Sequence, residues 1–201
     1  MMKSVLIAIR PQWVEKIANG EKTIEVRKTA PKEVPFKCYI YESRNGGHRC
    51  KHCNEKDSCY SYAPKNVGCY NGSGKVIGWF ICDKVDKIMT LQHTYYNFLG
   101  VPLATTTEYC IWNDDLPQMC LTKKEIEDYG KGKTIYGWHI SDLKIYDTPK
   151  ELSEFCIPCK VSCENCKNPL YFECWCEEKG KKIVTRPPQS WMHVEDLGEE
   201  E

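Results

Sequence analysis

Fourteen cysteines mark this chain, and the densest group of them lies between residues 156 and 186. Two C-x2-C pairs separated by three residues are followed by a C-x-C pair. Such turns hold thiolates at the geometry that tetrahedral zinc requires, and soft sulfur ligands favour zinc over calcium or magnesium. Six thiolates exceed four ligands, so two are spare or the site shares them; free buried cysteines or an iron–sulfur cluster are the alternatives. The cysteines are Cys156, Cys159, Cys163, Cys166, Cys174 and Cys176.

A second group of cysteines lies in the turn-rich segment 43–74, and His48 and His52 could replace one of its ligands. One C-x2-C pair with two further cysteines is compatible with a zinc ribbon. A site filled by cysteine has no open position for water, so the metal would be structural and not catalytic. We therefore predict one or two structural zinc ions in all. The cysteines of this group are Cys50, Cys53, Cys59 and Cys69.

The stretch "GEKTIEVRK", Gly20 to Lys28, places charged side chains in what otherwise reads as a strand. Side chains alternate along a strand, so Glu25 and Arg27 share one face, and Lys22 precedes them at the turn. A carboxylate flanked by two cations stays ionised and can accept hydrogen bonds from a base edge, while the cations hold a phosphate. The alternative is a surface salt-bridge ladder, worth roughly 0–1 kcal/mol.

Further ligand-binding candidates follow predicted turns. In "PPQSW", Trp191 leaves a rigid turn and could stack a base, an interaction worth roughly 1–3 kcal/mol, while Ser190 supplies a hydrogen-bond donor. Glu42 ends a predicted strand and could face the same cleft. Core packing is the alternative for Trp191, and a solvated strand end for Glu42. His139, in mid-strand, is expected to be a hydrogen-bonded core or edge histidine.

The elements that must position these residues are mostly strands. Apolar or alternating runs predict strands at Ser4–Ile9, around "TIEVRK" and at Phe36–Glu42, with a helix from Pro11 to Gly20 between the first two. We expect a long strand over Lys75–Ile88, in which Gly78 marks a bulge or a close backbone approach. No repeating strand–helix–strand unit is present, which indicates an α+β fold built on a small β-barrel flanked by short helices.

The second half is predicted to contain three helices and two strands. Helices are expected at Thr90–Gly100 and Thr107–Ile111, and a third follows Thr122, which forms a capping box with Glu125. A long strand over Thr134–Asp147 and a short turn or helix at "TPKELSEF" come next. The last strand lies around Trp191–Glu195. The segments 43–74 and 156–186 interrupt this pattern as two cysteine-rich, zinc-ribbon-like insertions.

Length and charge restrict the number of domains and the kinds of partner that the chain can have. The 201 residues suit one domain with insertions, and the formal net charge is zero. Residues 1–75 carry 14 Lys and Arg but 7 Asp and Glu, so this third could form a face that attracts phosphate. A scattered, solvated surface is the alternative. No export signal or membrane-length apolar run is found, which predicts a cytoplasmic protein with no membrane partner and with reduced, metal-binding cysteines.

Three stretches resemble the ASCH domains of the PUA-like superfamily, of a type common in phages and Firmicutes. They are "LIAIRPQWVEKIANGEKTIEVRKTAP", "GWHISDLKIYDTPKELSEF" and "RPPQSWMHVE", and the first carries the motif G-x-K-x-x-E-x-R. The resemblance covers most of residues 4–155 and 186–196 and implies a single PUA-like domain over residues 1–201. It also implies a cleft that binds RNA, a nucleotide or a modified nucleobase.

The same resemblance implies two alternatives. One small ASCH group hydrolyses 4-acetylcytidine with a Lys, a Thr and a Glu. The Lys falls on Lys22, but Glu25 stands at the Thr position, and Glu108 or Glu125 would have to supply the helix Glu. If the chain is an amidohydrolase, Lys22 and Glu25 are its catalytic candidates. The other alternative is a phage-encoded protein-interaction module. Because Glu25 breaks the hydrolase pattern, the sequence favours binding.

Overall fold

The computed structural model describes residues 3–44, 72–110, 115–158 and 182–198. Backbone contacts divide the chain into two compact units. Unit 1 comprises Met1–Val14, Phe36–Phe80 and Lys144–Glu201, and unit 2 comprises Glu15–Pro35 and Ile81–Leu143. None of the helices in the described ranges is both long and apolar enough to span a bilayer.

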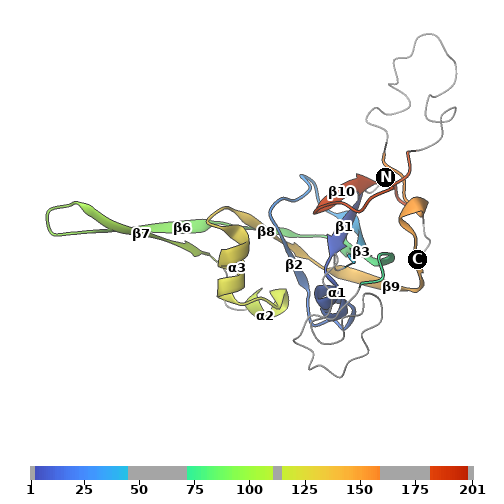
Figure 1. Cartoon of the computed structure of the whole chain (residues 1–201), viewed down its shortest axis with the longest axis horizontal. Coiled ribbons are helices and arrows are strands. Elements are labelled where there is room, and N and C mark those ends of the chain that lie inside the picture. The colour runs from blue at the N-terminus through green and yellow to red at the C-terminus, as the bar shows by residue number, and fades with distance from the viewer. Residues whose placement is uncertain (1–2, 45–71, 111–114, 159–181, 199–201) are drawn as a thin grey trace, which may run out of the picture. The chain divides into compact units, whose positions relative to one another are not determined.

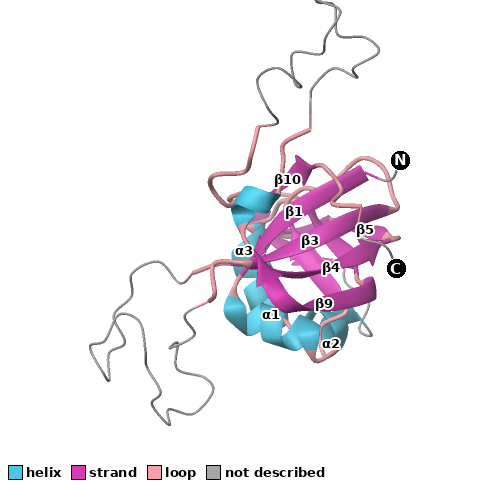
Figure 2. Ribbon diagram, turned by 90° about the vertical axis from the view of Figure 1, so that its right-hand side faces the viewer, coloured by secondary structure: helices cyan, strands magenta, loops and turns pink. Residues whose placement is uncertain are grey.

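Unit 1 is built on a five-stranded sheet with the order β10-β1-β3-β4-β9 (Figure 2). β1 pairs in parallel with β3 and antiparallel with β10. β1 and β3 are buried along nearly their whole length, which explains the continuous apolar run of β1, although β3 alternates in sequence and buries Lys37 as well. The strands are β1 (Lys3–Ile9), β3 (Phe36–Glu42), β4 (Val76–Cys82), β9 (Ser141–Lys150) and β10 (Trp191–Val194); a 3-10 helix, η1, covers Leu152–Glu154.

Gly78 in β4 allows the neighbouring strand to come close. A Cβ at this position would lie 2.2 Å from the backbone oxygen of Lys144 on β9, where no side chain fits. The sequence-based expectation of a close backbone approach at Gly78 is therefore confirmed.

A carboxylate fastens the last described residues of unit 1 to its sheet. Asp196 accepts hydrogen bonds from the Tyr39 hydroxyl at 2.8 Å and from Lys37 Nζ at 3.2 Å through one oxygen. Its other oxygen accepts from Ser4 Oγ at 3.2 Å. Burial by itself would raise the pKa of Asp196, but the bonds from Tyr39, the Gly198 amide and Lys37 outweigh burial and lower it.

Unit 2 contains a three-stranded sheet with the order β2-β8-β5 and a separate two-stranded sheet of β6 and β7. One core cluster packs against these elements: Ile24, Val26, Ile88, Tyr109, Met119, Ile126 and Ile135. The strands are β2 (Ile24–Arg27), β5 (Val85–Ile88), β6 (Thr90–Tyr96), β7 (Pro102–Tyr109) and β8 (Ile135–His139), and the helices are α2 (Asp115–Met119) and α3 (Lys123–Gly130) (Figure 1). Helix α1 (Pro11–Ala18) runs from unit 1 into unit 2.

Several predicted elements are confirmed with their local signals. The helix begins at Pro11 and ends before Gly20, whose φ of 73° is a left-handed conformation that glycine adopts readily. The capping box of α3 is formed, since Thr122 Oγ1 accepts from the Glu125 amide and Glu125 accepts from the Thr122 amide. The strands at Ser4–Ile9, at Phe36–Glu42 and near Trp191 are present as β1, β3 and β10.

Two predicted helices are wrong. Thr90–Gly100 contains strand β6 and the turn after it, and the described part of Thr107–Ile111 belongs mainly to strand β7. Thr90 begins strand β6, and the threonines and tyrosines of this region are β-formers that pair across two strands. The hydroxyls of Thr94 and Thr105, for example, lie 3.2 Å apart across the ribbon.

Both predicted long strands are divided. Lys75–Ile88 becomes β4 and β5, and Thr134–Asp147 becomes β8 followed by β9. In each case the chain leaves one sheet and enters the other, because β4 and β9 belong to the five-stranded sheet while β5 and β8 belong to the three-stranded one. Apolar alternation does not mark such a change of sheet. Strands dominate as expected, but the pairing in the described ranges gives three open sheets, so the closed β-barrel stays a prediction.

The Asp196 contacts predict a pH-dependent loss of stability. The folded state lowers the pKa of Asp196 below its ordinary value of 3.8, so its contribution is complete above that value and disappears as pH falls through the lower folded pKa. We expect Asp196→Asn to lower the free energy of unfolding by roughly 1–3 kcal/mol at pH 7. The difference in the free energy of unfolding between Asp196→Asn and the unsubstituted protein should shrink below about pH 4.

Urea unfolding at pH 7 and at pH 3 measures this difference, with Asp147→Asn at an exposed position of β9 as the control. A difference for Asp196→Asn that is unchanged at acid pH would contradict the assignment.

Candidate functional site

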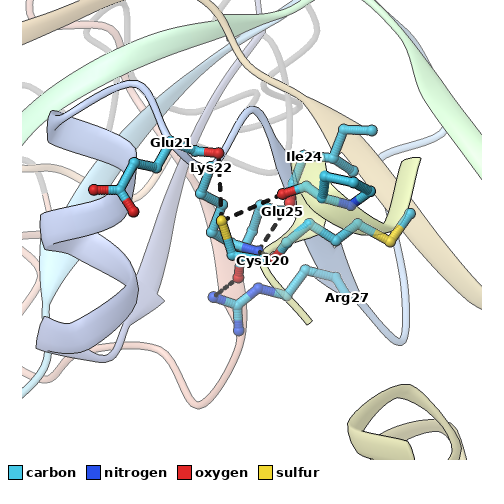
Figure 3. A network of polar contacts seen from close by, with 8 residues as sticks. Glu21, Lys22, Ile24, Glu25, Arg27 and Cys120 are labelled. Atoms are coloured by element: carbon cyan, nitrogen blue, oxygen red, sulfur yellow. Dashed lines mark hydrogen bonds and ion pairs between the residues drawn. The ribbon is translucent and has the colours of Figure 1, made fainter. Parts of the chain in front are cut away.

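Lys22, Glu25 and Arg27 converge at the start of β2 in unit 2 (Figure 3). Glu25 Oε2 lies 3.4 Å from Lys22 Nζ, and Glu25 Oε1 lies 3.0 Å from Arg27 Nη2. The structure therefore brings these three predicted site residues together, with the carboxylate between the two cations. We call Lys22, Glu25 and Arg27 the trio.

The trio is not the exposed ladder that the pattern also allowed. Lys22 is 2% exposed and Glu25 is 5% exposed, while the Arg27 side chain keeps a small exposed part. β2 is enclosed because it pairs with β8 and lies against α2. Glu25 stands opposite Trp138 in this pairing, and Trp138 is fully buried. Alternation predicted the shared side of Glu25 and Arg27, but it could not show that both sides of β2 are covered.

Lys22 fastens β2 to the end of α2. Its ammonium donates to the backbone oxygen of Met119, the last residue of α2, at 2.5 Å and to that of Ile24 at 2.9 Å. With the nearby Glu25 carboxylate, these contacts match the three donors of a protonated lysine. Nearby, Cys120 Sγ donates to the Glu21 carbonyl at 3.3 Å (Figure 3). Lys22 thus acts first as a structural cation.

The solvent side of the trio is formed by Arg27 together with Lys28 and Tyr129. Lys28 Nζ lies 4.9 Å from the centre of the Tyr129 ring, a cation–π distance. Burial raises the pKa of the Tyr129 hydroxyl, and the Arg27 charge acts in the opposite direction. We call Arg27, Lys28 and Tyr129 the basic rim. Tyr129 is not among the predicted site residues, because the capping box that marks helix α3 in the sequence says nothing about which of its side chains lies beside β2.

The other ligand-binding candidates lie in unit 1. Glu42 ends β3, and its carboxylate accepts from the Ser73 amide at 2.6 Å. The Ser190 carbonyl accepts from the Ala8 amide at 3.0 Å, and the partly buried Trp191 packs edge-on against His193 with ring centres 5.3 Å apart. Because the trio belongs to unit 2, a pocket shared with these residues stays a prediction.

Three acid–base residues have clear local partners. His139, at the end of the central strand β8, has its Nε2 2.5 Å from Asp86 Oδ2, in line with the expected hydrogen-bonded core or edge histidine. Burial would raise the pKa of Asp86, but the bonds from His139 and Lys84 lower it. Glu125 is used by the capping box of α3. Glu108, the other candidate for a helix glutamate, lies in strand β7.

Nine of the ten predicted zinc ligands lie outside the described residues; Cys156 is described. The described ranges contain no group of three His, Cys, Asp or Glu side chains placed to hold a metal. Each cysteine-rich segment nevertheless begins and ends at neighbouring positions, since the residues that flank it contact each other. Glu42 exchanges backbone hydrogen bonds with Gly74 and Lys75, and Cys156 forms an antiparallel bridge with Ile183.

No protein-family model and no curated protein matches this sequence. Among solved structures, the crystal structure of ASCH from Zymomonas mobilis matches with a TM-score of 0.50 at 16% identity, covering 96% of this chain and 88% of that one. The chain has the ASCH fold. Two single-substitution mutants of the same Zymomonas mobilis protein also match, each with a TM-score of 0.47 at 14% identity, covering 96% of this chain and 91% or 89% of theirs. The resemblance drawn from the sequence motifs is thus confirmed for the fold.

The buried trio predicts a large difference between two glutamates four residues apart. Glu25→Gln keeps the shape of the side chain but leaves two buried cations without their counter-charge, which costs about 3–5 kcal/mol of the free energy of unfolding. Glu21→Gln removes only the exposed pair with Lys16, worth roughly 0–1 kcal/mol. Urea unfolding at pH 7 compares the two variants. Equal, small losses would show that the trio is not a buried, mutually dependent network.

Proposed function

We propose that this protein binds RNA, a nucleotide or a modified nucleobase, and that the basic rim of unit 2 makes the contacts. The observation that carries the proposal is the ion pair of 3.0 Å between Glu25 and Arg27 at the edge of a buried network. Arg27 is held in one orientation from the inside, while Lys28 and Tyr129 stand beside it on the outside. The ASCH fold, which belongs to the PUA-like superfamily linked to RNA, supports this proposal.

The chemistry of the rim suits a phosphate next to a base. A guanidinium fixed by a carboxylate offers its outer N–H groups in a set plane, and phosphate accepts such paired donors. A tyrosine ring can stack an unpaired base. When a base takes the position over Tyr129, Lys28 can turn toward the phosphate. Lys22 and Glu25 then act as positioning residues, because they hold Arg27 and do not touch the ligand.

Glu42, Ser190 and Trp191 are proposed to contribute a second set of contacts from unit 1. Trp191 would stack a base, and Ser190 and Glu42 would hydrogen bond to base or sugar. We also propose that the sheets close into a PUA-like barrel. The protein is proposed to be cytoplasmic, where its cysteines stay reduced.

Binding is preferred over amide hydrolysis because of the surroundings of Lys22. A nucleophilic or basic lysine must reach its substrate, yet Lys22 is only 2% exposed, and its Nζ is directed at two backbone oxygens and at the Glu25 carboxylate. Glu25 also stands where the resemblance to 4-acetylcytidine hydrolases calls for threonine. No contact in the described residues favours the hydrolase over a binding protein.

The proposal predicts that one rim lysine matters more than a nearby lysine of equal charge. Fluorescence anisotropy with labelled single-stranded RNA, measured from 50 to 200 mM salt, should show affinity that falls as salt rises. Lys28→Glu should weaken binding roughly tenfold and reduce the salt slope by about one. Lys32→Glu makes the same charge change at an exposed position of the same segment and should have a smaller effect.

Equal losses in the two variants would leave only general electrostatic attraction and contradict the rim. Absence of salt-dependent binding would overturn the proposal as a whole. Turnover of 4-acetylcytidine that disappears in Lys22→Ala would instead establish the hydrolase.

We further propose that the two cysteine-rich segments hold one or two structural zinc ions in all. Native mass spectrometry should find one or two zinc ions per chain, and a strong chelator should remove them. Cys159→Ser and Cys50→Ser should each lower the zinc content, whereas Cys110→Ser, at an exposed cysteine outside both groups, should not. Less than one zinc per chain, or iron with visible absorbance, would refute the zinc sites.

A further inference from the structure

Most of the exposed large apolar side chains among the described residues lie on or directly beside the ribbon formed by β6 and β7. Of eleven exposed large hydrophobic residues, eight lie between residues 89 and 103. Each is more than half exposed, and Phe98 at the tip is 95% exposed. The eight are Met89, Leu91, Tyr95, Tyr96, Phe98, Leu99, Val101 and Leu103. An apolar surface of this extent on one element is typical of a protein-binding surface.

The ribbon is also free of charge. Residues 88–107 contain no Asp, Glu, Lys or Arg, although these residue types make up 28% of the chain. Without Lys or Arg the ribbon cannot neutralise phosphates, so it is separate from the nucleic-acid surface proposed above. A surface without charge is complementary to another surface without charge. Among the described residues, the ribbon is the surface of this kind, so a second copy of the ribbon is a suitable partner.

The ribbon is held firmly at both ends. At its base, Tyr109 belongs to the core cluster of unit 2 and its hydroxyl donates to the Lys133 carbonyl at 2.8 Å. At its tip, Asn97 Oδ1 accepts from the amides of Leu99 and Val101, each at 2.9 Å. These bonds fix the backbone of the turn that carries Phe98. A preorganised apolar tip loses little conformational entropy when it binds.

One edge of the ribbon is open for pairing. β6 has β7 as its neighbour on one side, and no described strand pairs with its other side (Figure 1). Natural edge strands are protected by lysine, proline or bulges, and the seven residues of β6, "TLQHTYY", include no lysine or proline. β7 is the less suitable edge, because it begins with Pro102 and carries the bulge opposite Tyr95 and Tyr96.

We propose that two copies of this chain associate through their β6 edges, antiparallel about a two-fold axis, to form a four-stranded sheet β7-β6-β6-β7. Leu91 and Tyr95 lie on one face of β6, so the favoured register places Leu91 opposite the partner's Tyr95, and the reverse. The same register brings the apolar tip of each ribbon beside the partner's Met89. Pairing satisfies the open backbone groups of β6 and brings the apolar side chains of β6 and of the tip against those of the partner, while β7 stays on the outside.

The exposed area is sufficient for a stable dimer. A fully exposed aromatic side chain presents roughly 150–250 Å², and the eight residues together present on the order of 800–1,000 Å². A standard interface buries about 800 Å² per partner. Most of the exposed apolar area belongs to β6, its flanking Met89 and the tip, which face the partner in the proposed sheet, so the available area is comparable to that of a standard interface.

Sedimentation velocity without nucleic acid tests the proposal. The full chain at tens of micromolar should sediment at twice its 23.4 kDa mass. Leu91→Lys and Tyr95→Lys should each raise the dimer dissociation constant roughly tenfold or more. Ala104→Lys is the matched control, because it places the same charge opposite Tyr95 on β7, the outer strand of the proposed sheet, and should leave the dimer intact.

The register has its own test. The double variant Leu91→Lys/Tyr95→Glu places opposite charges across the two-fold axis and should restore the dimer, whereas Leu91→Lys/Tyr95→Lys should not. Circular dichroism checks that each variant folds. The proposal is overturned by a monomeric chain, by a dimer that Leu91→Lys and Tyr95→Lys leave unchanged, or by a monomer whose ribbon binds neutral lipid vesicles. Loss of RNA binding in Lys28→Glu bears on the basic rim and leaves this result unaffected.

Discussion

The ammonium group of Lys22 constrains unit 2 more than any other single group. Moving a charge of this kind out of water costs several kcal/mol after relaxation, and the cost must be offset by contacts at close range. Two backbone oxygens and the Glu25 carboxylate supply those contacts. Because the oxygens come from β2 and from the last residue of α2, the lysine can remain buried only when strand and helix end lie together. The end of α2 is therefore tied to this buried charge, in addition to the bond from the Thr23 amide to the Gln118 carbonyl at 3.0 Å and the packing of Met119 in the core cluster.

The same constraint determines how the site can work. Glu25 balances Lys22 on one side and Arg27 on the other, so it cannot turn toward a ligand without exposing two cations to each other. A carboxylate held in this way is a poor partner for a base edge, although it is a good anchor for a guanidinium. The sequence interpretation assigned ligand contacts to all three residues. In the proposed function the ligand contacts instead fall to Arg27 and to the neighbouring Lys28 and Tyr129, whose ring lies 4.9 Å from Lys28 Nζ.

How far the sequence could predict this structure depends on where the decisive contacts lie along the chain. Pro11, Gly20 and the Thr122–Glu125 box act over a few residues, and the elements they predict are present. The convergence of Glu25 and Arg27 was likewise visible from strand alternation, and the motif resemblance correctly predicted the ASCH fold. Burial of Lys22 could not be predicted, because Met119 lies 97 residues further along the chain. The helices assigned to β6 and β7 failed since cross-strand pairs between threonines leave no local signal.

Unit 2 buries some of its charged side chains and exposes some of its large apolar ones, which is the reverse of the usual distribution. Soluble proteins bury apolar groups and leave Lys and Glu in water, yet here Lys22 and Glu25 are buried while Phe98 is almost fully exposed. Each departure lowers stability unless something compensates for it. For the trio the compensation lies inside unit 2, as ion pairs and hydrogen bonds. For the ribbon no described residue provides it, and a rigid, uncharged edge is suited to pair with a surface of the same kind. The two departures thus have different explanations: the buried charges build the site, and the exposed apolar ribbon points to a partner.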